Sequence, residues 1–199
     1  AHGRVLVFVD ADLRLAPDCV ERLAAPIVSG VETATYTRDI GVANADDPWS
    51  ACWSLHRGVA PGTYMPPGLP ERWANARAVD RGAFLSVGGY EDVGYGEDMT
   101  LAPKLGVLAR AVPNARMWHH NPDSLREVWH NALWVGRGVR IRERGHVARD
   151  RMPWRSLRRG VTVAWRAHRP RYAVFRPVYD LGVLIGFAQS GRSPERHWK

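Results

Sequence analysis

Two aspartates that could bind a metal ion, Asp10 and Asp12, follow an apolar run close to the start of the sequence. The run, Val5 to Val9, contains mostly β-branched and aromatic residues, which favours a strand that is buried on both faces. Ligands of open α/β sheets bind outside the carboxyl ends of the strands, and side chains two residues apart on a strand point the same way. We therefore expect Asp10 and Asp12 to converge on Mg²⁺ or Mn²⁺, with water and nucleotide phosphates completing the coordination. An Asp-x-Asp triplet also occurs by chance, so a role without a metal is the alternative.

A second pair of acids, Glu97 and Asp98, follows a glycine-rich segment and begins a predicted helix over residues 97–106. Acidic residues at a helix start are favoured by the helix dipole, and these two could have only that role. A carboxylate in a site crowded with other acids and phosphate could instead serve as a general base. Upstream, Gly88 and Gly89 predict a tight turn after an apolar helix.

Two adjacent histidines, His119 and His120, end a segment, residues 109–120, that predicts a hairpin or a bent strand. A histidine after a strand can ligate a metal, although such pairs more often pack or lie at the surface. Both roles stay open from the sequence alone.

Helical patterns position these residues. The clearest helix covers residues 121–145, where Ser124 and Glu127 have the capping-box spacing and Asn121 or Asp123 could also cap it. Further predicted elements are a helix within residues 13–28 whose first turn contains Pro17, a strand over 33–37, a short helix from residue 46, and a Pro- and Gly-rich flap over 58–73 that borders the site.

Composition limits the classes of protein that the chain can belong to. Its 199 residues, 45% of them hydrophobic, suffice for one well-buried domain. The net charge of +8 indicates an anionic partner: a nucleotide diphosphate, an acidic membrane surface or nucleic acid. Two cysteines in no metal-ligand spacing indicate a reducing compartment, and no signal peptide is evident. We therefore expect a cytoplasmic location, with attachment to the inner face of the membrane as the alternative.

The segment from Arg149 onward is rich in arginine and tryptophan and ends in an apolar run, Val178 to Ala188. That run is shorter than the roughly 20 residues that span a bilayer. Amphipathic helices on an anionic membrane surface and ordinary helices packed on the sheet domain are both consistent with this pattern.

Three motifs in fixed order resemble family 2 glycosyltransferases of the GT-A fold: VFVDAD, NARAVDRGAFLSVGGYEDVGYGEDMTLAPKL and HHNPDSLREVWHNALWVGRG. The combination covers roughly residues 3 to 140 and is more specific than any one motif. The resemblance implies an α/β fold and a bacterial-type, inverting enzyme. Such an enzyme moves a sugar from a nucleotide-sugar donor to the hydroxyl of a saccharide or lipid-linked acceptor, with Mg²⁺ or Mn²⁺ and without a nucleic-acid partner.

The same resemblance assigns roles to individual residues. It implies that Asp10, Asp12 and His119, with His120 as the substitute, hold the metal, and that Asp98, supported by Glu97, is the general base. It further implies a set of residues for the diphosphate and the substrates: Arg137 and Arg140 for the diphosphate, and Asn75, Gly88, Gly89 and Trp134 for the substrates.

Two departures from the family pattern matter. Processive members carry Gln-x-x-Arg-Trp where this chain has His130 to Trp134, so only the tryptophan is kept and we expect a non-processive enzyme. Family members also place a nucleotide-binding half before Asp-x-Asp, and the sequence has no such half ahead of Asp10. We therefore expect residues 1–148 to be a GT-A domain truncated at its N-terminus, of doubtful activity alone, and residues 149–199 to be a basic helical extension.

Two other classes compete with this interpretation. A haloacid-dehalogenase-like, Mg²⁺-dependent phosphatase also ends a hydrophobic strand in Asp-x-Asp, but its pattern continues with Gly-Thr, whereas this chain has Leu13 and Arg14. A basic nucleic-acid-binding protein would explain the arginines and tryptophans, but no known module of that kind is evident.

Overall fold

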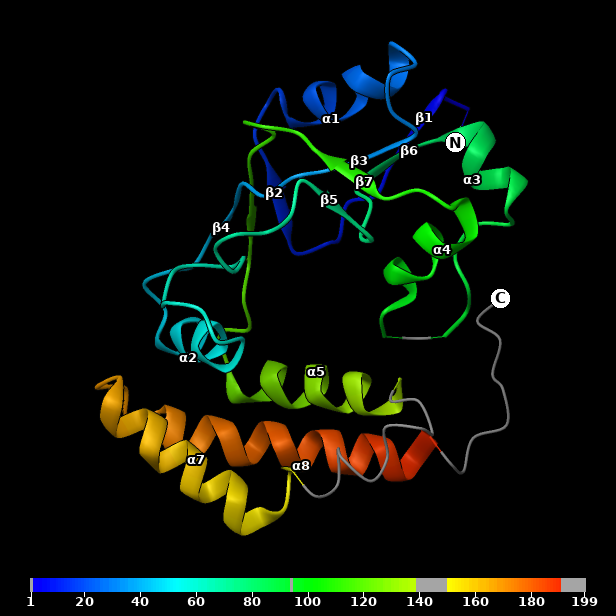
Figure 1. The fold of residues 1–199 in the computed structure, drawn as a ribbon. Helices are drawn as coiled ribbons and strands as arrows, with labels where there is room; N and C mark the ends of the chain where they lie inside the picture. Colours follow the sequence, from blue (N-terminus) through cyan, green and yellow to red (C-terminus); the bar gives the residue numbers. More distant parts are fainter. Residues whose placement is uncertain (1, 94, 139–149, 191–199) are drawn as a thin grey trace. The chain divides into compact units, whose positions relative to one another are not determined.

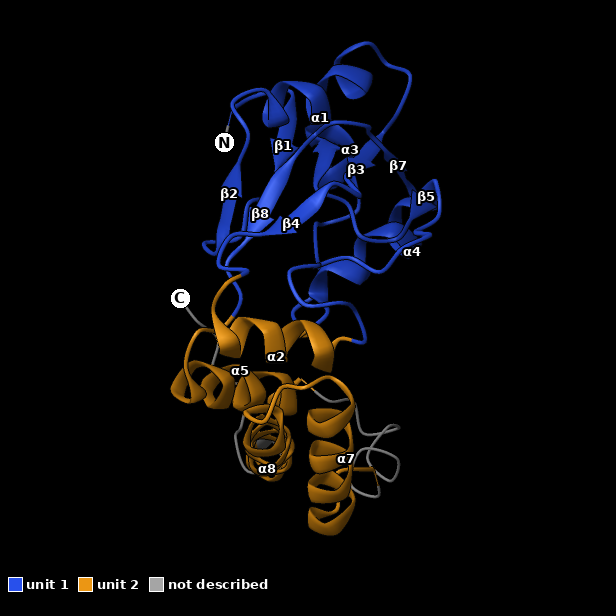
Figure 2. Ribbon diagram, turned by 90° about the vertical axis from the view of Figure 1, so that its left-hand side faces the viewer, with its two compact units in different colours: residues 1–45, 58–92, 96–121 blue, residues 46–57, 93–95, 122–199 orange. Residues whose placement is uncertain are grey.

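The computed structural model describes residues 2–93, 95–138 and 150–190 of an α/β chain (Figure 1). The chain divides into two compact units (Figure 2). Unit 1 consists of residues 1–45, 58–92 and 96–121 and holds the strands, and unit 2 consists of residues 46–57, 93–95 and 122–199 and is helical. The coarse prediction of an α/β fold is confirmed, and all the acids of the predicted site lie in unit 1.

The larger sheet of unit 1 is mixed. Its strand order is β1 (Val5–Val7), β6 (Ala78–Asp80), β3 (Ala34–Tyr36), β7 (Ala109–Ala111) and β5 (Arg72–Trp73). Only β3 and β7 pair in parallel, and the other neighbours are antiparallel.

Alternate side chains of β1 face two separate parts of the core. Val5 and Val7 pack against the cluster that contains α1 (Cys19–Val28), whereas Leu6 packs in the cluster that contains α4 (Leu101–Leu105). Helix α3 (Arg81–Ser86) follows β6 and contributes to the second cluster. The sequence predicted a strand that is buried on both faces. Both faces of β1 do pack against core clusters, but its residues are only partly buried because β1 lies at the edge of the sheet.

A second, smaller sheet brings distant segments together. Strand β8 (Met117–His119) lies between β2 (Leu13–Leu15), which is antiparallel to it, and β4 (Ile40–Val42), which is parallel to it. Leu13–Leu15 pair with β8 before α1 begins at Cys19, close to Pro17, where the sequence placed the first helical turn. The hairpin predicted over residues 109–120 is wrong, since β7 and β8 belong to different sheets, which leaves the bent segment.

Several local predictions are confirmed. Helix α1, strand β3 and helix α2 (Pro48–His56) form where the patterns placed them. Helix α5 (Leu125–Arg137) starts with a capping box: the Ser124 hydroxyl accepts from the amide of Glu127, whose carboxylate accepts from the amide of Asp123. Asn121 and Asp123 are therefore not its caps.

Unit 2 has its own core. Helices α2, α5, α7 (Pro153–Arg166) and α8 (Tyr172–Ser190) surround a buried cluster that includes Trp53, Val128, Phe175 and Tyr179. The apolar run from Val178 to Ala188 lies on α8, and its Val183 is fully buried in this cluster. Among the described residues, no helix is both long and apolar enough to cross a membrane.

Helices α5 and α8 approach closely because glycines lie at their contact. A Cβ atom on Gly186 would overlap the carbonyl oxygen of Leu133, and a Cβ atom on Gly182 would lie 2.7 Å from that of Ala132. A Cβ atom on Gly160 of α7 would meet nothing nearer than 3.3 Å. The absence of side chains therefore sets the spacing of α5 and α8.

The α5–α8 contact predicts unequal effects for the same substitution at two glycines. Gly186→Ala should lower the free energy of unfolding by about 2 kcal/mol, because overpacking against a backbone oxygen exceeds the gain in helix propensity. Gly160→Ala offers the same gain in propensity, and its methyl group would make a tight contact of 3.3 Å with the Ala173 oxygen that a small shift relieves, so its stability should stay within about 1 kcal/mol of the parent. Urea unfolding followed by circular dichroism measures both, and equal losses in the two variants would contradict this packing.

Candidate functional site

Asp10 and Asp12 lie in a turn between the two sheets. The chain leaves β1 after Val7, and the amide of Leu13 donates to the carbonyl of Asp10 over 3.1 Å, which closes a turn over residues 10–13. The expectation that both carboxylates point the same way along a strand is therefore wrong, because alternation holds only for extended chain. The two side chains instead find different partners.

Asp12 faces His119. The pairing of β2 with β8 places Leu13 opposite His119, and the amide of His120 donates to the carbonyl of Asp12 over 2.8 Å. The Asp12 Oδ2 atom lies 3.1 Å from His119 Nε2. The hydrogen bond from His119 is the largest of the effects that lower the pKa of the Asp12 carboxyl, while its partial burial opposes them.

The other side of the His119 ring is fixed. Its Nδ1 atom lies 3.0 Å from Oδ1 of Asn121, which is fully buried, and Asn44 brackets Asn121 by bonding both its amide and its carbonyl. The Tyr64 ring stacks on the imidazole with ring centroids 4.1 Å apart. Tyr64 comes from the flap predicted to border the site, and the predicted position of that flap is confirmed at this contact.

This arrangement fits a cation. When Nδ1–H donates to Asn121, the lone pair of His119 Nε2 points at the Asp12 carboxylate, and only a proton or a metal ion satisfies both groups. Among the described residues, no third His, Cys, Asp or Glu joins them to form a group that could hold a metal. Two protein ligands suit Mg²⁺ or Mn²⁺, which commonly retain water and bind substrate phosphates.

Asp10 has a different partner. Its Oδ2 atom lies 2.7 Å from Nη1 of Arg77, whose side chain is largely buried. Arg77 stands just before β6, and its backbone carbonyl accepts from the amide of Phe8, so the chain next to Asp10 is tied to the chain that carries its cation. Because its carboxylate is paired with Arg77, Asp10 is not positioned as a third metal ligand beside Asp12 and His119.

Asp98 is half-buried in the short helix η1 (Glu97–Met99), where the Asn75 side-chain amide donates to its carboxylate. The start of η1 has no side-chain cap, since Gly96 occupies that position. Asp98 therefore does not cap a helix, and the amide of Asn75 orients its carboxylate instead. Helix capping is therefore excluded as the reason for an acid at position 98, whereas a favourable interaction with the helix dipole is not.

The Tyr90 hydroxyl lies near acids from both predicted pairs, Asp10 from the first and Glu97 and Asp98 from the second. Burial raises its pKa to about 12, and the charges of Asp98, Glu97 and Asp10 add to this while the charge of Arg77 opposes it. These four charges therefore lie close enough to act on one hydroxyl. The ring packs against Phe8 and Phe84, which holds the hydroxyl in place and protonated at neutral pH.

The remaining predicted residues of unit 1 have structural contacts. Gly88 and Gly89 both adopt positive φ and end helix α3, and a Cβ atom on Gly89 would lie 2.9 Å from the Phe84 ring. His120 is exposed, and its ring lies 3.4 Å from the Asn44 amide rather than beside Asp12. The structure brings His119, not His120, to the Asp12 carboxylate.

Two further predicted residues belong to unit 2. Trp134 is half exposed on α5 and meets Tyr95 edge-on, with ring centroids 5.2 Å apart. Arg137 donates to the Gln189 side chain from two of its nitrogens. Arg140 lies outside the described residues.

Sequence reasoning missed Arg77, Asn121, Asn44 and Tyr64. Arg77 stands two residues after Asn75 in a segment entering a strand, so alternation could have placed both side chains on one face. Asn121, directly after the histidines, is a polar residue that can bond an imidazole nitrogen. No local signal identifies Tyr64, whose ring reaches His119 only through the folded flap.

Comparisons of the whole sequence do not assign the chain to a family: no protein-family model and no curated protein matches it.

The contact between Asp12 and His119 makes a prediction about titration. The Asp12 carboxyl should titrate below its ordinary value of 3.8, and His119→Gln should move it upward, because the neutral amide cannot supply the positive charge. Since its folded pKa is depressed, Asp12 stabilises the fold above pH 3.8 and this contribution is lost as the pH falls through the lower folded value. Carbon-13 NMR of labelled aspartate measures the shift.

Asp18 is the internal control for that titration. Its pKa is lowered by a hydrogen bond from Arg22 on the same helix, so His119→Gln should leave it unchanged. An Asp12 carboxyl that titrates identically in parent and variant would show that the pair does not form in solution.

Proposed function

We propose that this chain forms the metal-binding and acceptor side of a family 2 glycosyltransferase of the GT-A type, which transfers a sugar from a nucleotide-sugar donor to an acceptor hydroxyl. The observation that supports this most strongly is the pairing of two different carboxylates with two different partners in one unit. The Asp12 carboxylate lies beside the His119 imidazole, and these two side chains could share a cation. The Asp98 carboxylate accepts a hydrogen bond from the neutral amide of Asn75, which does not compensate its charge. The order of these residues agrees with the three motifs of the resemblance.

Asp12 and His119 would hold the divalent cation in this proposal. When bound, the cation would stabilise the negative charge that develops on the nucleoside diphosphate as its bond to the sugar breaks. The chain contributes the orientation: Asn121 fixes the tautomer of His119, and Tyr64 fixes the plane of its ring. Asp10 keeps the cationic side chain of Arg77 at the edge of the same site, where a diphosphate could bind.

Asp98 would be the general base. The attacking hydroxyl loses its proton to the Asp98 carboxylate as its oxygen bonds to the anomeric carbon and the diphosphate leaves, so a single displacement inverts the anomeric configuration. A hydrogen bond from Asn75 orients the carboxylate without neutralising it. Tyr90 stays protonated beside it and can donate to a sugar oxygen but not accept the proton.

The proposal predicts that Asp98→Asn lowers turnover by about 10² to 10⁴-fold while nucleotide binding stays nearly intact. The amide keeps the shape of the side chain and can still bond Asn75, but it cannot accept a proton. The complete gene product would be assayed with Mn²⁺ and a panel of nucleotide sugars, following release of nucleoside diphosphate.

Glu97→Gln is the matched control, because it changes the neighbouring acid in the same helix. It should keep most of the turnover. Loss in Glu97→Gln with activity retained in Asp98→Asn would move the base by one residue, and full activity in both variants would contradict the mechanism. A thermal melt of each variant confirms that it is folded.

A further inference from the structure

Helix α7 carries one stripe of small residues and a second stripe of large apolar residues. Ser156, Gly160 and Ala164 recur every four residues and are buried. A second stripe of large side chains is exposed to solvent on the same helix: Trp154, Leu157, Val161 and Trp165, at exposed fractions of 62%, 55%, 51% and 83%. At 100° per residue, the spacing of the second stripe places its members on one face, next to the buried one.

The small stripe is used within unit 2. A Cβ atom on Gly160 would lie 3.3 Å from the backbone of Ala173, which shows that α7 packs on α8 through these residues. The core therefore accounts for one stripe and leaves the large residues uncovered. Isolated exposed apolar residues are ordinary, but a row of four with two tryptophans indicates a binding surface.

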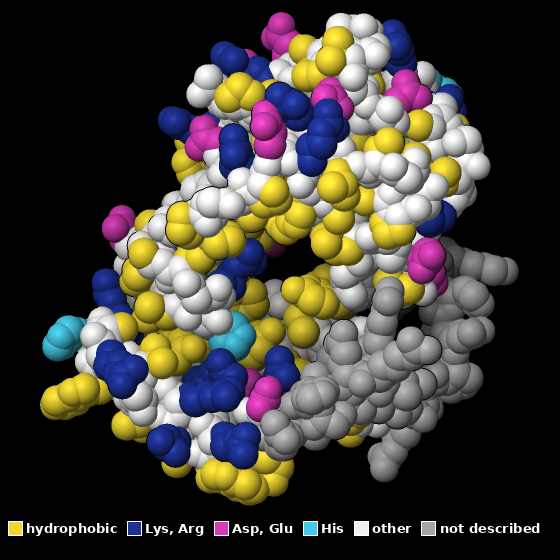
Figure 3. Space-filling view, in the orientation of Figure 1, with side chains coloured by type: hydrophobic (Ala, Val, Ile, Leu, Met, Phe, Trp, Pro, Cys, Tyr) yellow, Lys and Arg dark blue, Asp and Glu magenta, His cyan; other side chains and the backbone are white. Residues whose placement is uncertain are grey.

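Arginines lie on the other side of the exposed stripe. From Pro153 to Arg171 the sequence contains no acidic residue and includes the following arginines: Arg155, Arg158, Arg159, Arg166, Arg169 and Arg171. Arg158, Arg159 and Arg166 are exposed and form no ion pair with a carboxylate among the described residues. In Figure 3, dark-blue and yellow side chains alternate over this end of unit 2.

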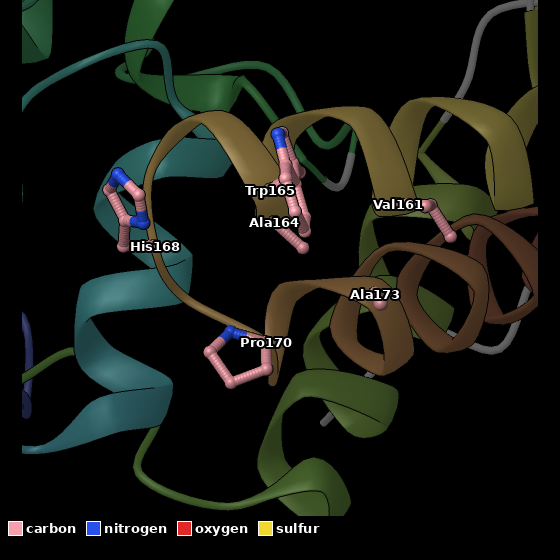
Figure 4. A pocket seen from close by; sticks show the side chains of 6 residues that line it. All are labelled: Val161, Ala164, Trp165, His168, Pro170 and Ala173. Atoms are coloured by element: carbon pink, nitrogen blue, oxygen red, sulfur yellow. The ribbon is translucent and has the colours of Figure 1, made fainter.

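The apolar surface continues from α7 onto the start of α8. A pocket of about 410 Å³ is lined by Val161, Ala164 and Trp165 of α7, by His168 and Pro170 of the connection, and by Ala173 of α8 (Figure 4). Its lining carries no acid, and it opens beside the most exposed tryptophan of the stripe. An apolar recess of this size next to cationic side chains suits an inserted hydrocarbon group.

We propose that the α7–α8 hairpin binds peripherally to an anionic lipid surface, with Trp154, Leu157, Val161 and Trp165 at the headgroup–acyl boundary. The flanking arginines contact lipid phosphates. Indole rings and aliphatic side chains are stabilised at this boundary, and each nearby arginine adds attraction to anionic lipids. The stripe runs over roughly 17 Å of helix, which lies along the surface, and no described helix is long and apolar enough to cross the bilayer.

This assignment differs from the one suggested by hydropathy alone. The longest apolar run of the C-terminal segment, Val178 to Ala188, contributes Val183 to the core and packs its glycines against α5. The membrane-binding side chains therefore lie on the more polar helix. The charge pattern favours lipid over a protein partner. Arg155 lies 3.8 Å from Asp150, but Arg158, Arg159 and Arg166 have no carboxylate partner among the described residues and complement a uniformly anionic surface.

Vesicle flotation of the complete gene product tests the proposal. Vesicles of phosphatidylglycerol and phosphatidylcholine should bind the protein, and pure phosphatidylcholine should bind it much less. The double variant Trp154→Ser, Trp165→Ser should lower the partition coefficient at least about tenfold. Arg158→Gln and Arg159→Gln together should lower it by roughly 25-fold at low salt, and less at high salt, since each arginine is worth about fivefold.

Two control variants lie outside the hairpin. Val31→Ser removes an apolar side chain that is 75% exposed in unit 1, and Arg126→Gln removes an exposed arginine of α5. Both should bind vesicles as the parent does. Binding that is absent, equal on both vesicle types, or unchanged in the tryptophan variant would overturn the proposal. So would binding of random duplex DNA that the arginine variant abolishes in a protein that does not float with vesicles.

Discussion

The antiparallel pairing of β2 with β8 is the constraint on which the candidate site depends. It joins chain segments more than 100 residues apart, with Leu13 opposite His119, and the next backbone bond ties Asp12 to His120. Neither Asp12 nor His119 could hold this position alone, since Asp12 lies in a turn and His119 ends a strand. Parallel pairing of β8 with β4 then brings Asn44 to Asn121, which fixes the imidazole from behind. The small sheet is thus the scaffold of the proposed cation site.

Charge is distributed unevenly across this scaffold. Asp10 has a close guanidinium partner and Asp12 an imidazole, whereas the described contact of Asp98 is with a neutral amide. A carboxylate bonded to an amide keeps its full charge available, which suits proton abstraction better than ligation of a paired cation. Tyr90, packed on Phe8 and Phe84, lies within reach of the charges of Asp10, Arg77 and Asp98 and remains neutral.

Local patterns predicted the helices well and the site only partly. The capping box at Ser124 and the stripe from Cys19 to Ile27 are encoded by neighbours in sequence, so they could be read directly. The direction of the Asp10 side chain could not be predicted in this way. Whether residues 10–12 continue a strand or form a turn depends on the pairing of β2 with β8. Likewise, the sequence left open whether the helices after Arg149 lie on a membrane surface or pack on the sheet domain, because which stripe of α7 is covered depends on the contact of Gly160 with α8. Those interactions between distant residues leave no local signal.

The most direct test of the central claim is the affinity of a nucleoside diphosphate, measured by calorimetry with and without Mn²⁺. If Asp12 and His119 hold a cation that binds the diphosphate, Mn²⁺ should strengthen binding by about tenfold or more. Asp12→Asn should abolish that gain, while Asp39→Asn, which alters a carboxylate paired with Arg116 elsewhere in unit 1, should keep it. Diphosphate binding that is unaffected by Mn²⁺, or a gain that persists in Asp12→Asn, would contradict the account.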